Sequence, residues 1–184
     1  MPFSETVKRL FEELETRRRE LRLGAREDCL CVSLVEQKLW LLNRGMTVTA
    51  WPISTSRAEP SCVPDSLGTP RGLHQIAEKI GAGEPIGTVF KGRTPLGFVW
   101  QNAPEPLRDE NLITSRILWL DGLEAGKNRG AGCDTHSRYV YIHGTNQEGK
   151  IGTRNSHGCV LLRNADMLSV FDAAPTGAFV WIGD

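Results

Sequence analysis

The stretch YIHGTNQEGKIGTRNSHGCVLL, residues 141–162, carries the strongest chemical signal in this chain. It places two histidines, one cysteine and four glycines within 22 residues. His143 ends a short apolar run, and Cys159 follows sixteen positions later, directly behind the tripeptide Ser-His-Gly. Three interpretations are open: a metal site, a thiol prepared for nucleophilic attack, or an ordinary loop.

The thiol interpretation needs a base and a site for developing negative charge. A free cysteine has a pKa near 8.5, so only about 3% of it is thiolate at pH 7. His143 follows the predicted strand residues 139–142 and could be held at a sheet edge as that base. Gly158 allows close approach of the backbone, and amides near Gly158 and Cys159 could form an oxyanion hole. The pattern therefore favours acyl transfer through a thioester.

The metal interpretation uses five nitrogen or sulfur ligands, which are Cys133, His136, His143, His157 and Cys159. Structural zinc sites are built from such residue types. Their spacing here matches no common zinc pattern, so this alternative is the weaker one. The residues alone leave it open.

Most of the chain predicts short strands separated by loops. The expected strands are residues 29–35, 38–42, 46–53, 71–77, 97–101, 116–120, 138–142 and 178–182. An amphipathic helix is expected between Ser4, as N-cap, and Gly24, as stop signal. A second, short helix is expected over residues 165–171, capped by Asn164. The predicted fold class is mostly β, a sandwich-like or barrel-like sheet with few short helices and an added N-terminal helix.

Composition excludes some classes of function. The chain holds 22 basic and 22 acidic residues, and this balance argues against a nucleic-acid binder. No apolar stretch approaches the roughly 18 residues that a membrane span needs. The N-terminus lacks the features of a signal peptide, and five cysteines without regular spacing fit a reducing compartment. We therefore expect cytoplasmic localisation, or the cell envelope if a leader was removed, with Cys29, Cys31 and Cys62 as small buried residues.

Three segments of the chain resemble the L,D-transpeptidase catalytic-domain family, whose signature is His-Gly, a spacer and then Ser-x-Gly-Cys. They are HGT at 143–145, IGTRNSHGC at 151–159 and the LRN that follows. Upstream, QKLWLLNRGMTVTAWPISTS and GTPRGLHQI are similar to the entry strands and the Thr-Pro-x-Gly segment of the family. The resemblance implies a β-sandwich-like, mostly antiparallel catalytic domain over residues 28–184, preceded by a helical extension over residues 1–27.

The same resemblance implies roles for five residues. Cys159 matches the nucleophile and His143 the general base. Gly158, with the backbone of His157 and Cys159, matches the oxyanion region, and Ser156 matches the residue that supports the catalytic loop. The family uses no metal and no organic cofactor. Candidate substrate-binding residues flank this motif, and they are Tyr141, Gly144, Thr145, Asn146, Arg154 and Arg163.

The implied substrate is the peptidoglycan stem tetrapeptide. The thiolate attacks the carbonyl of the third residue and expels the terminal D-Ala. An amine then resolves the acyl-enzyme, giving 3→3 crosslinks or exchange of D-amino acids, or water does so. Because a cytoplasmic enzyme would meet soluble muropeptides and abundant water, we expect an L,D-carboxypeptidase of murein recycling. Transpeptidation is the alternative, and an inactive muropeptide-binding module a lesser one. Carbapenem-type inhibitors acylate many members of the family.

The chain departs from the family pattern at Leu161. Many members carry arginine at this position, two residues after the cysteine. If residues 159–163 are extended, Arg163 points to the same side as Leu161 and could partly replace that charge. The departure puts in doubt how the substrate or the catalytic loop is held, and it leaves the nucleophile unaffected.

Overall fold

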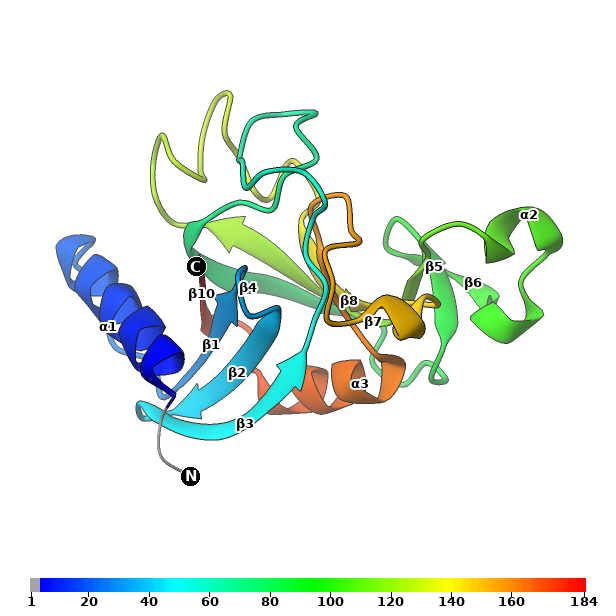
Figure 1. Cartoon of the computed structure of the whole chain (residues 1–184), viewed down its shortest axis with the longest axis horizontal. Coiled ribbons are helices and arrows are strands. Elements are labelled where there is room, and N and C mark those ends of the chain that lie inside the picture. The colour runs from blue at the N-terminus through cyan, green and yellow to red at the C-terminus, as the bar shows by residue number, and fades with distance from the viewer. Residues whose placement is uncertain (1–3) are drawn as a thin grey trace.

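The computed structural model describes residues 4–184, and Figure 1 shows the arrangement of the elements. The helices are α1 (Glu5–Glu20), α2 (Glu105–Arg108) and α3 (Asn164–Ala173), with short 3₁₀ turns η1 (Trp100–Asn102) and η2 (Glu148–Lys150). The strands are β1 (Asp28–Ser33), β2 (Lys38–Asn43), β3 (Met46–Pro52), β4 (Gly72–Ile80), β5 (Thr88–Lys91), β6 (Thr94–Val99), β7 (Ile113–Gly122), β8 (Tyr141–Gly144), β9 (Val160–Leu162) and β10 (Phe179–Gly183).

The strands form one mixed sheet in the order β3-β2-β1-β10-β4-β7-β5-β6, while β8 pairs with β7 and β9 pairs with β8. The pairings are antiparallel except β1 with β10 and β8 with β9. The expectation of a mostly β fold with an added N-terminal helix is confirmed. The parallel pairing of β8 with β9 matters most for function, because it carries the residues of the motif.

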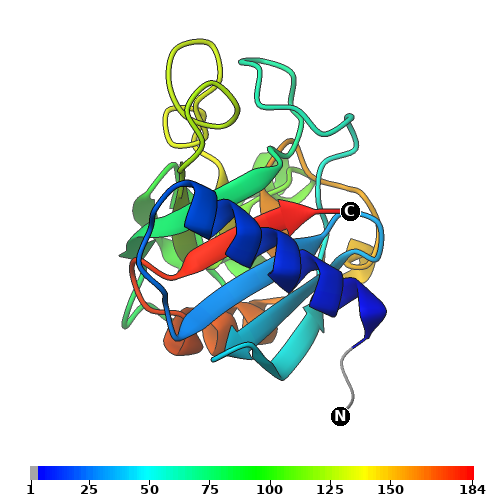
Figure 2. The same ribbon diagram turned by 90° about the vertical axis from the view of Figure 1, so that its left-hand side faces the viewer.

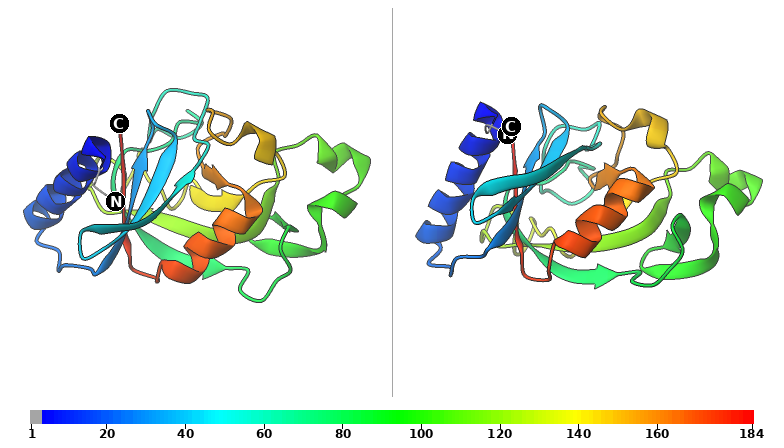
Figure 3. Two further views of the ribbon diagram at one scale, coloured as in Figure 1. Left: turned by 60° about the horizontal axis from the view of Figure 1, so that its bottom comes forward. Right: turned by 90° about the horizontal axis from the view of Figure 1, so that it is seen from below.

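The main core lies between the two halves of this sheet. It contains alternate residues of β1 and β7, such as Leu30, Val32, Leu118 and Leu120, together with apolar residues of α3. In Figure 3, α3 (orange) lies between the blue and cyan strands and the green strands. Side chains alternate between the faces of a strand, so Ile117, Trp119 and Tyr141, which form a separate cluster, face away from α3.

Helix α1 covers the opposite face of the first half of the sheet, as Figure 2 shows. Its buried residues Val7, Leu10 and Leu14 pack in a second cluster that includes Trp40 and Trp181. The helix begins as predicted, since the Val7 N–H donates to Ser4 Oγ at 3.4 Å. It ends at Glu20, before the predicted stop at Gly24. Helix α1 therefore packs on the sheet. The division of the chain into an extension over residues 1–27 and a catalytic domain over residues 28–184 stays a prediction.

Several local predictions are wrong. Strand β8 begins at Tyr141 and not at residue 138, because Arg138 and Tyr139 lie in a turn where Tyr139 has a φ of 55°. Strands β5 and β9, helix α2 and η1 were not predicted, and η1 occupies residues 100–102 where a strand was expected to end. Asn164 is the first residue of α3, and Arg163 occupies the N-cap position.

The expectation for the cysteines is wrong at Cys62 and Cys133, which form a disulfide with a Cα–Cα distance of 5.0 Å. The bond joins the 53–71 loop to the 123–140 loop, which lie beside each other at the top of Figures 1 and 2. The two cysteines are 71 positions apart, so only the tertiary structure brings them together. Cys29 and Cys31 are free and buried, as expected.

None of the helices within residues 4–184 has the length and apolar character required to cross a membrane.

Candidate active site

The register of β8 and β9 brings the two halves of the motif together. His143 lies opposite Leu161 in the parallel pair, and Cys159 stands immediately before β9. The Tyr141 N–H approaches Cys159 Sγ at 3.4 Å, which places the thiol beside β8. Tyr141 and Cys159 belong to a small apolar cluster on the face of β7 and β8 that is turned away from α3. His143 on β8 and Cys159 at the start of the neighbouring strand β9 are therefore close in space, although sixteen positions separate them in the chain.

His143 is held in the form that a general base requires. Its Nδ1 atom lies 2.7 Å from the Gly144 carbonyl oxygen. A carbonyl only accepts, so Nδ1 carries the hydrogen and Nε2 is left unprotonated. The residue is 4% exposed, and this burial lowers the pKa of His143 to about 4, against a smaller opposing effect of the Gly144 carbonyl. The imidazole is therefore neutral near pH 7 and can receive a proton.

Cys159 is a protonated thiol at rest. Burial raises the pKa of Cys159 to about 11, while the Tyr141 N–H and the charge of Arg138 act in the opposite direction. At pH 7 a thiol with that pKa is ionised in roughly one molecule in 10,000. The thiolate must therefore form during the reaction, by proton transfer to a base such as His143.

Ser156 holds the conformation of the catalytic loop, residues 151–159 between η2 and β9. Its hydroxyl donates to the Cys159 carbonyl at 2.5 Å and accepts the Gly158 N–H at 3.2 Å. Gly158 has a φ of 127°, which favours glycine strongly. Because Ser156 occupies the Gly158 N–H, this amide is not a free oxyanion donor. Within residues 4–184, no partner is found for the N–H groups of His157 and Cys159, so these two remain as the candidate donors.

The 53–71 loop is hydrogen-bonded to the catalytic loop and to β9. Ser54 and Leu161 exchange two backbone hydrogen bonds, of 2.9 and 2.8 Å, and the Ser156 N–H donates to Thr55 O at 3.0 Å. Leu161 is 1% exposed, so at the position of the departure this chain supplies buried packing. Arg163 Nη1 lies 4.0 Å from Asp166 Oδ2 at the start of α3. The expectation that Arg163 partly replaces a charge at Leu161 stays a prediction.

Two of the predicted substrate-binding residues, Thr145 and Asn146, bind the 105–112 segment. Thr145 is buried and donates to Asn111 Oδ1 at 3.0 Å. Asn146 accepts the Leu112 N–H and donates to the carbonyls of Arg108 and Glu110, which ties the end of α2 to the motif. The two residues therefore hold the 105–112 segment in place.

The other predicted substrate-binding residues differ in what their positions allow. Gly144 is buried where an added Cβ would lie 2.7 Å from Thr114 O, so packing of the strands requires a glycine there. Arg154 is partly exposed, with Nη1 3.9 Å from Glu59 Oε1. The Tyr141 hydroxyl accepts a hydrogen bond from Arg93 at 3.1 Å, and Tyr141 is the predicted residue that lies next to the thiol.

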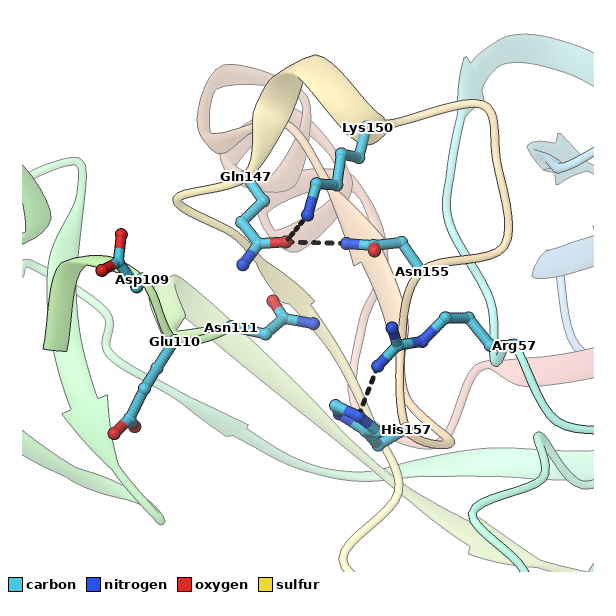
Figure 4. A pocket seen from close by; sticks show the side chains of 8 residues that line it. All are labelled: Arg57, Asp109, Glu110, Asn111, Gln147, Lys150, Asn155 and His157. Carbon is cyan, nitrogen blue, oxygen red and sulfur yellow. Dashed lines mark hydrogen bonds between the residues drawn. The ribbon is translucent and has the colours of Figure 1, made fainter.

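A cavity of about 470 Å³ opens beside the catalytic loop, and Figure 4 shows its walls. It is lined by Arg57, Asp109, Glu110, Asn111, Gln147, Lys150, Asn155 and His157. The acidic residues Asp109 and Glu110 lie on one side and the Arg57–His157 pair on the other. Arg57 Nη2 lies 2.8 Å from His157 Nε2, and since a guanidinium only donates, Nε2 is the acceptor. The cavity thus presents both signs of charge to a ligand.

A cluster of aromatic and cationic side chains near Tyr141 was missed at the sequence level. His136 stacks on Trp119 with ring centroids 3.9 Å apart, and the Arg93 guanidinium lies 4.5 Å from the same ring and 5.2 Å from Tyr139. Nothing in the spacing of these residues indicates that they meet, because they come from separate strands and loops. Arg138 was also missed, although it is the first residue of the strand predicted over residues 138–142.

The zinc interpretation loses two of its five ligands to other structural roles. Cys133 is in the disulfide with Cys62, and His136 stacks on Trp119. Among residues 4–184, no three side chains of His, Cys, Asp or Glu are grouped closely enough to hold a metal ion. The roles of His143 as base and Cys159 as nucleophile stay predictions at this point.

Residues 27–182 match the L,D-transpeptidase catalytic domain family, YkuD. The match spans most of the chain, so this chain belongs to that family of cysteine enzymes. Two curated relatives share shorter stretches with it. "Probable L,D-transpeptidase YbiS" of Escherichia coli K12 is 51% identical over 43 residues, 23% of this chain and 14% of the relative. "Probable L,D-transpeptidase ErfK/SrfK" of Salmonella typhimurium is 49% identical over 47 residues, 26% and 15% respectively.

Solved structures share the fold at low sequence identity. L,D-transpeptidase 3 from Mycobacterium tuberculosis, in complex with a faropenem-derived adduct, has a TM-score of 0.54 and 15% identity, covering 86% of this chain and 60% of that one. An L,D-transpeptidase from Mycobacterium smegmatis has a TM-score of 0.51 and 16% identity, covering 85% and 58%. The matched region therefore spans about three fifths of these structures and a much smaller part of the curated relatives.

Proposed function

We propose that this protein transfers acyl groups from peptidoglycan stem tetrapeptides through an acyl-Cys159 intermediate. The observation that carries the proposal is the pairing of β8 with β9, which places a buried neutral His143 on β8 and a glycine-preceded thiol beside that strand, directly before β9. Membership in the L,D-transpeptidase family supports the choice of substrate. The bond cleaved is the one between the third residue and the terminal D-Ala.

Each group of the site has a separate role in the proposed acylation step. His143 Nε2 takes the proton from Cys159 Sγ, and the sulfur forms a bond to the carbonyl carbon of the third residue. The negative charge that develops on the carbonyl oxygen is stabilised by the N–H groups of His157 and Cys159. One such donor contributes about 3–4 kcal/mol to a transition state. The protonated His143 then gives its proton to the amine of the leaving D-Ala.

The acceptor that resolves the acyl-enzyme is proposed to be an amine, giving transpeptidation or exchange of D-amino acids. The expectation of hydrolysis depended on a cytoplasmic location, but the Cys62–Cys133 disulfide favours an oxidising compartment such as the cell envelope. The cavity beside His157 also supports an amine acceptor. Its opposed charges suit a zwitterionic amino-acid end, with a carboxylate near Arg57 and an ammonium near Asp109 and Glu110. Hydrolysis by water, as an L,D-carboxypeptidase, is the second candidate.

Sensitivity to β-lactams is part of the proposal. The Mycobacterium tuberculosis neighbour was solved with a faropenem-derived adduct, and another neighbour in complex with imipenem. We propose that imipenem acylates Cys159. Intact-protein mass spectrometry should show one adduct on the wild type and none on Cys159→Ala.

The test is to incubate the protein with a disaccharide-tetrapeptide and to follow the products by mass. Crosslinked dimers, or exchange with an added D-amino acid, would support transpeptidation, whereas tripeptide with free D-Ala as the main product would support hydrolysis. Cys159→Ala should abolish both reactions. Turnover that survives in this variant would refute the thiol mechanism, and absence of turnover in the wild type would favour the inactive binding module.

A further inference from the structure

Arg138 connects the two loops that enclose the thiol. It lies in the turn before β8, and its guanidinium reaches across to the 53–71 loop. Nη1 donates to Ser61 O at 3.0 Å, and Nη2 donates to Gly68 O at 3.0 Å and approaches Ser66 Oγ at 3.4 Å. All of these partners are neutral. Among residues 4–184, no carboxylate bonds this half-buried guanidinium directly.

The same contacts place this charge next to Cys159. The carbonyl of Tyr139, the residue after Arg138, lies 3.6 Å from Cys159 Sγ. Gly68 O, which accepts from Arg138, lies 3.4 Å from the position that a Cβ of Gly158 would occupy. The guanidinium and the thiol are thus linked through two short backbone segments, one at Tyr139 and one at Gly68.

The electrostatic effects of the pair support each other. Burial lowers the pKa of Arg138, and a negative Cys159, followed by Asp65, raises it again. In return, the charge of Arg138 lowers the pKa of the Cys159 thiol against the larger effect of burial. The other charged or titratable groups around the thiol are Tyr141 and His143 on β8, Tyr139 in the turn, and Arg93 on the β5–β6 hairpin, with Glu78 and His136 behind them.

The disulfide holds the same two loops. Cys62 directly follows Ser61, whose carbonyl accepts from Arg138, and Cys133 lies five positions before Arg138. One covalent bond and three hydrogen bonds therefore span the same gap. Together they restrict how far the guanidinium can move from the thiol.

We propose that Arg138, held by the 53–71 loop and secured by the Cys62–Cys133 disulfide, is a positioning residue that provides the positive potential in which Cys159 becomes a thiolate. In this step the S–H bond breaks and the proton moves to His143 Nε2, with no other bond changed. The proposal depends on Cys159 being the nucleophile. It adds an electrostatic residue that lies outside the His-Gly and Ser-x-Gly-Cys motif.

The experiment measures the reactivity of the thiol without substrate. The rate at which iodoacetamide alkylates Cys159 is followed as a function of pH by peptide mass spectrometry, which separates it from Cys29 and Cys31. Arg138→Gln should raise the apparent pKa of alkylation by about one unit and slow the reaction about tenfold at pH 7.5. Arg138→Lys, which keeps the charge, should recover most of the rate. A purely structural role of the side chain would make the two variants alike.

The matched control is Arg129→Gln, which removes an exposed arginine from the same 123–140 loop and should leave the alkylation profile unchanged. Folded Arg138→Gln with wild-type alkylation would overturn the inference. Should that variant fail to fold, Cys62→Ser combined with Cys133→Ser carries the test, with at least threefold slower alkylation expected and an unchanged rate overturning it. If Cys159→Ala retains turnover, the proposed function fails. If only the alkylation result fails, the proposed function stands.

Discussion

Removal of the Cys62–Cys133 disulfide should destabilise this protein mainly through its unfolded state. The bond closes a loop between cysteines 71 positions apart. In the chain-entropy model, a loop of this length costs the unfolded chain an entropy of about 15 cal/mol/K, or about 4 kcal/mol at 25 °C. The free energy of unfolding of a small protein is roughly 5–15 kcal/mol. The double variant Cys62→Ser/Cys133→Ser should therefore lose a large part of the free energy of unfolding.

Urea unfolding followed by tryptophan fluorescence provides the assay. The midpoint should fall in the double variant and, by a similar amount, in the wild type treated with a reductant. The dependence on urea should also steepen, because the unfolded chain without a crosslink exposes more surface. Adding the reductant to the double variant is the control and should change nothing further.

A thiol count tests the premise independently. Denatured wild type without reductant should show three reactive thiols, those of Cys29, Cys31 and Cys159, and all five cysteines should react after reduction. Five thiols before reduction would refute the pairing. A confirmed disulfide with unchanged stability after its removal would refute the reasoning about loop entropy.

Three further predictions concern the site and its buried histidines. Leu161→Arg, which places a guanidinium where the side chain is 1% exposed, should lower the free energy of unfolding by at least about 3 kcal/mol, whereas Leu161→Met should cost less than about 1.5 kcal/mol in the same urea assay. Equal stability of the two variants would show that the position tolerates a charge. Gly158→Ala forces a side chain onto a φ of 127°, at a cost of about 1–3 kcal/mol, and should reduce kcat/KM for tetrapeptide cleavage at least tenfold in a folded protein. Wild-type kcat/KM would mean that the loop adapts. Burial lowers the pKa of both His74 and His143 to about 4, so as pH falls the unfolded chain takes up protons first, and stability that is complete above pH 6.5 is lost towards pH 4. Each histidine should contribute a loss of about 2 kcal/mol by pH 5, His74→Gln should remove about half of the dependence, and equal stability at pH 7.5 and 5 would contradict the assignment.

The motif around Cys159 could be recognised from the sequence because its residues lie close together in the chain. Ser156, Gly158 and Cys159 act within one turn, and the hydroxyl of Ser156 bonds only atoms of that turn. Local sequence is sufficient to specify such a motif, because the backbone conformation and the short hydrogen bonds depend on neighbours in the chain. The N-cap at Ser4 was predictable for the same reason.

Contacts between distant segments explain what was missed. Strand β9 has only three residues, too few for a periodic pattern, and it exists because β8 and Ser54 pair with it. The side chains of Thr145 and Asn146 bind the 105–112 segment, which the sequence does not place near the motif. Their predicted contact with substrate stays a prediction.

The sequence by itself indicated the class of protein, and it predicts the nucleophile and the base, because the residues that carry the motif lie within 22 positions. The tertiary structure decided which groups surround the thiol. It brought Arg138 and the Cys62–Cys133 disulfide to the loops near Cys159, and it formed the charged cavity that His157 lines. These groups come from loops whose relative positions depend on how the sheet closes around α3, and such long-range packing leaves no periodic or local trace in a sequence.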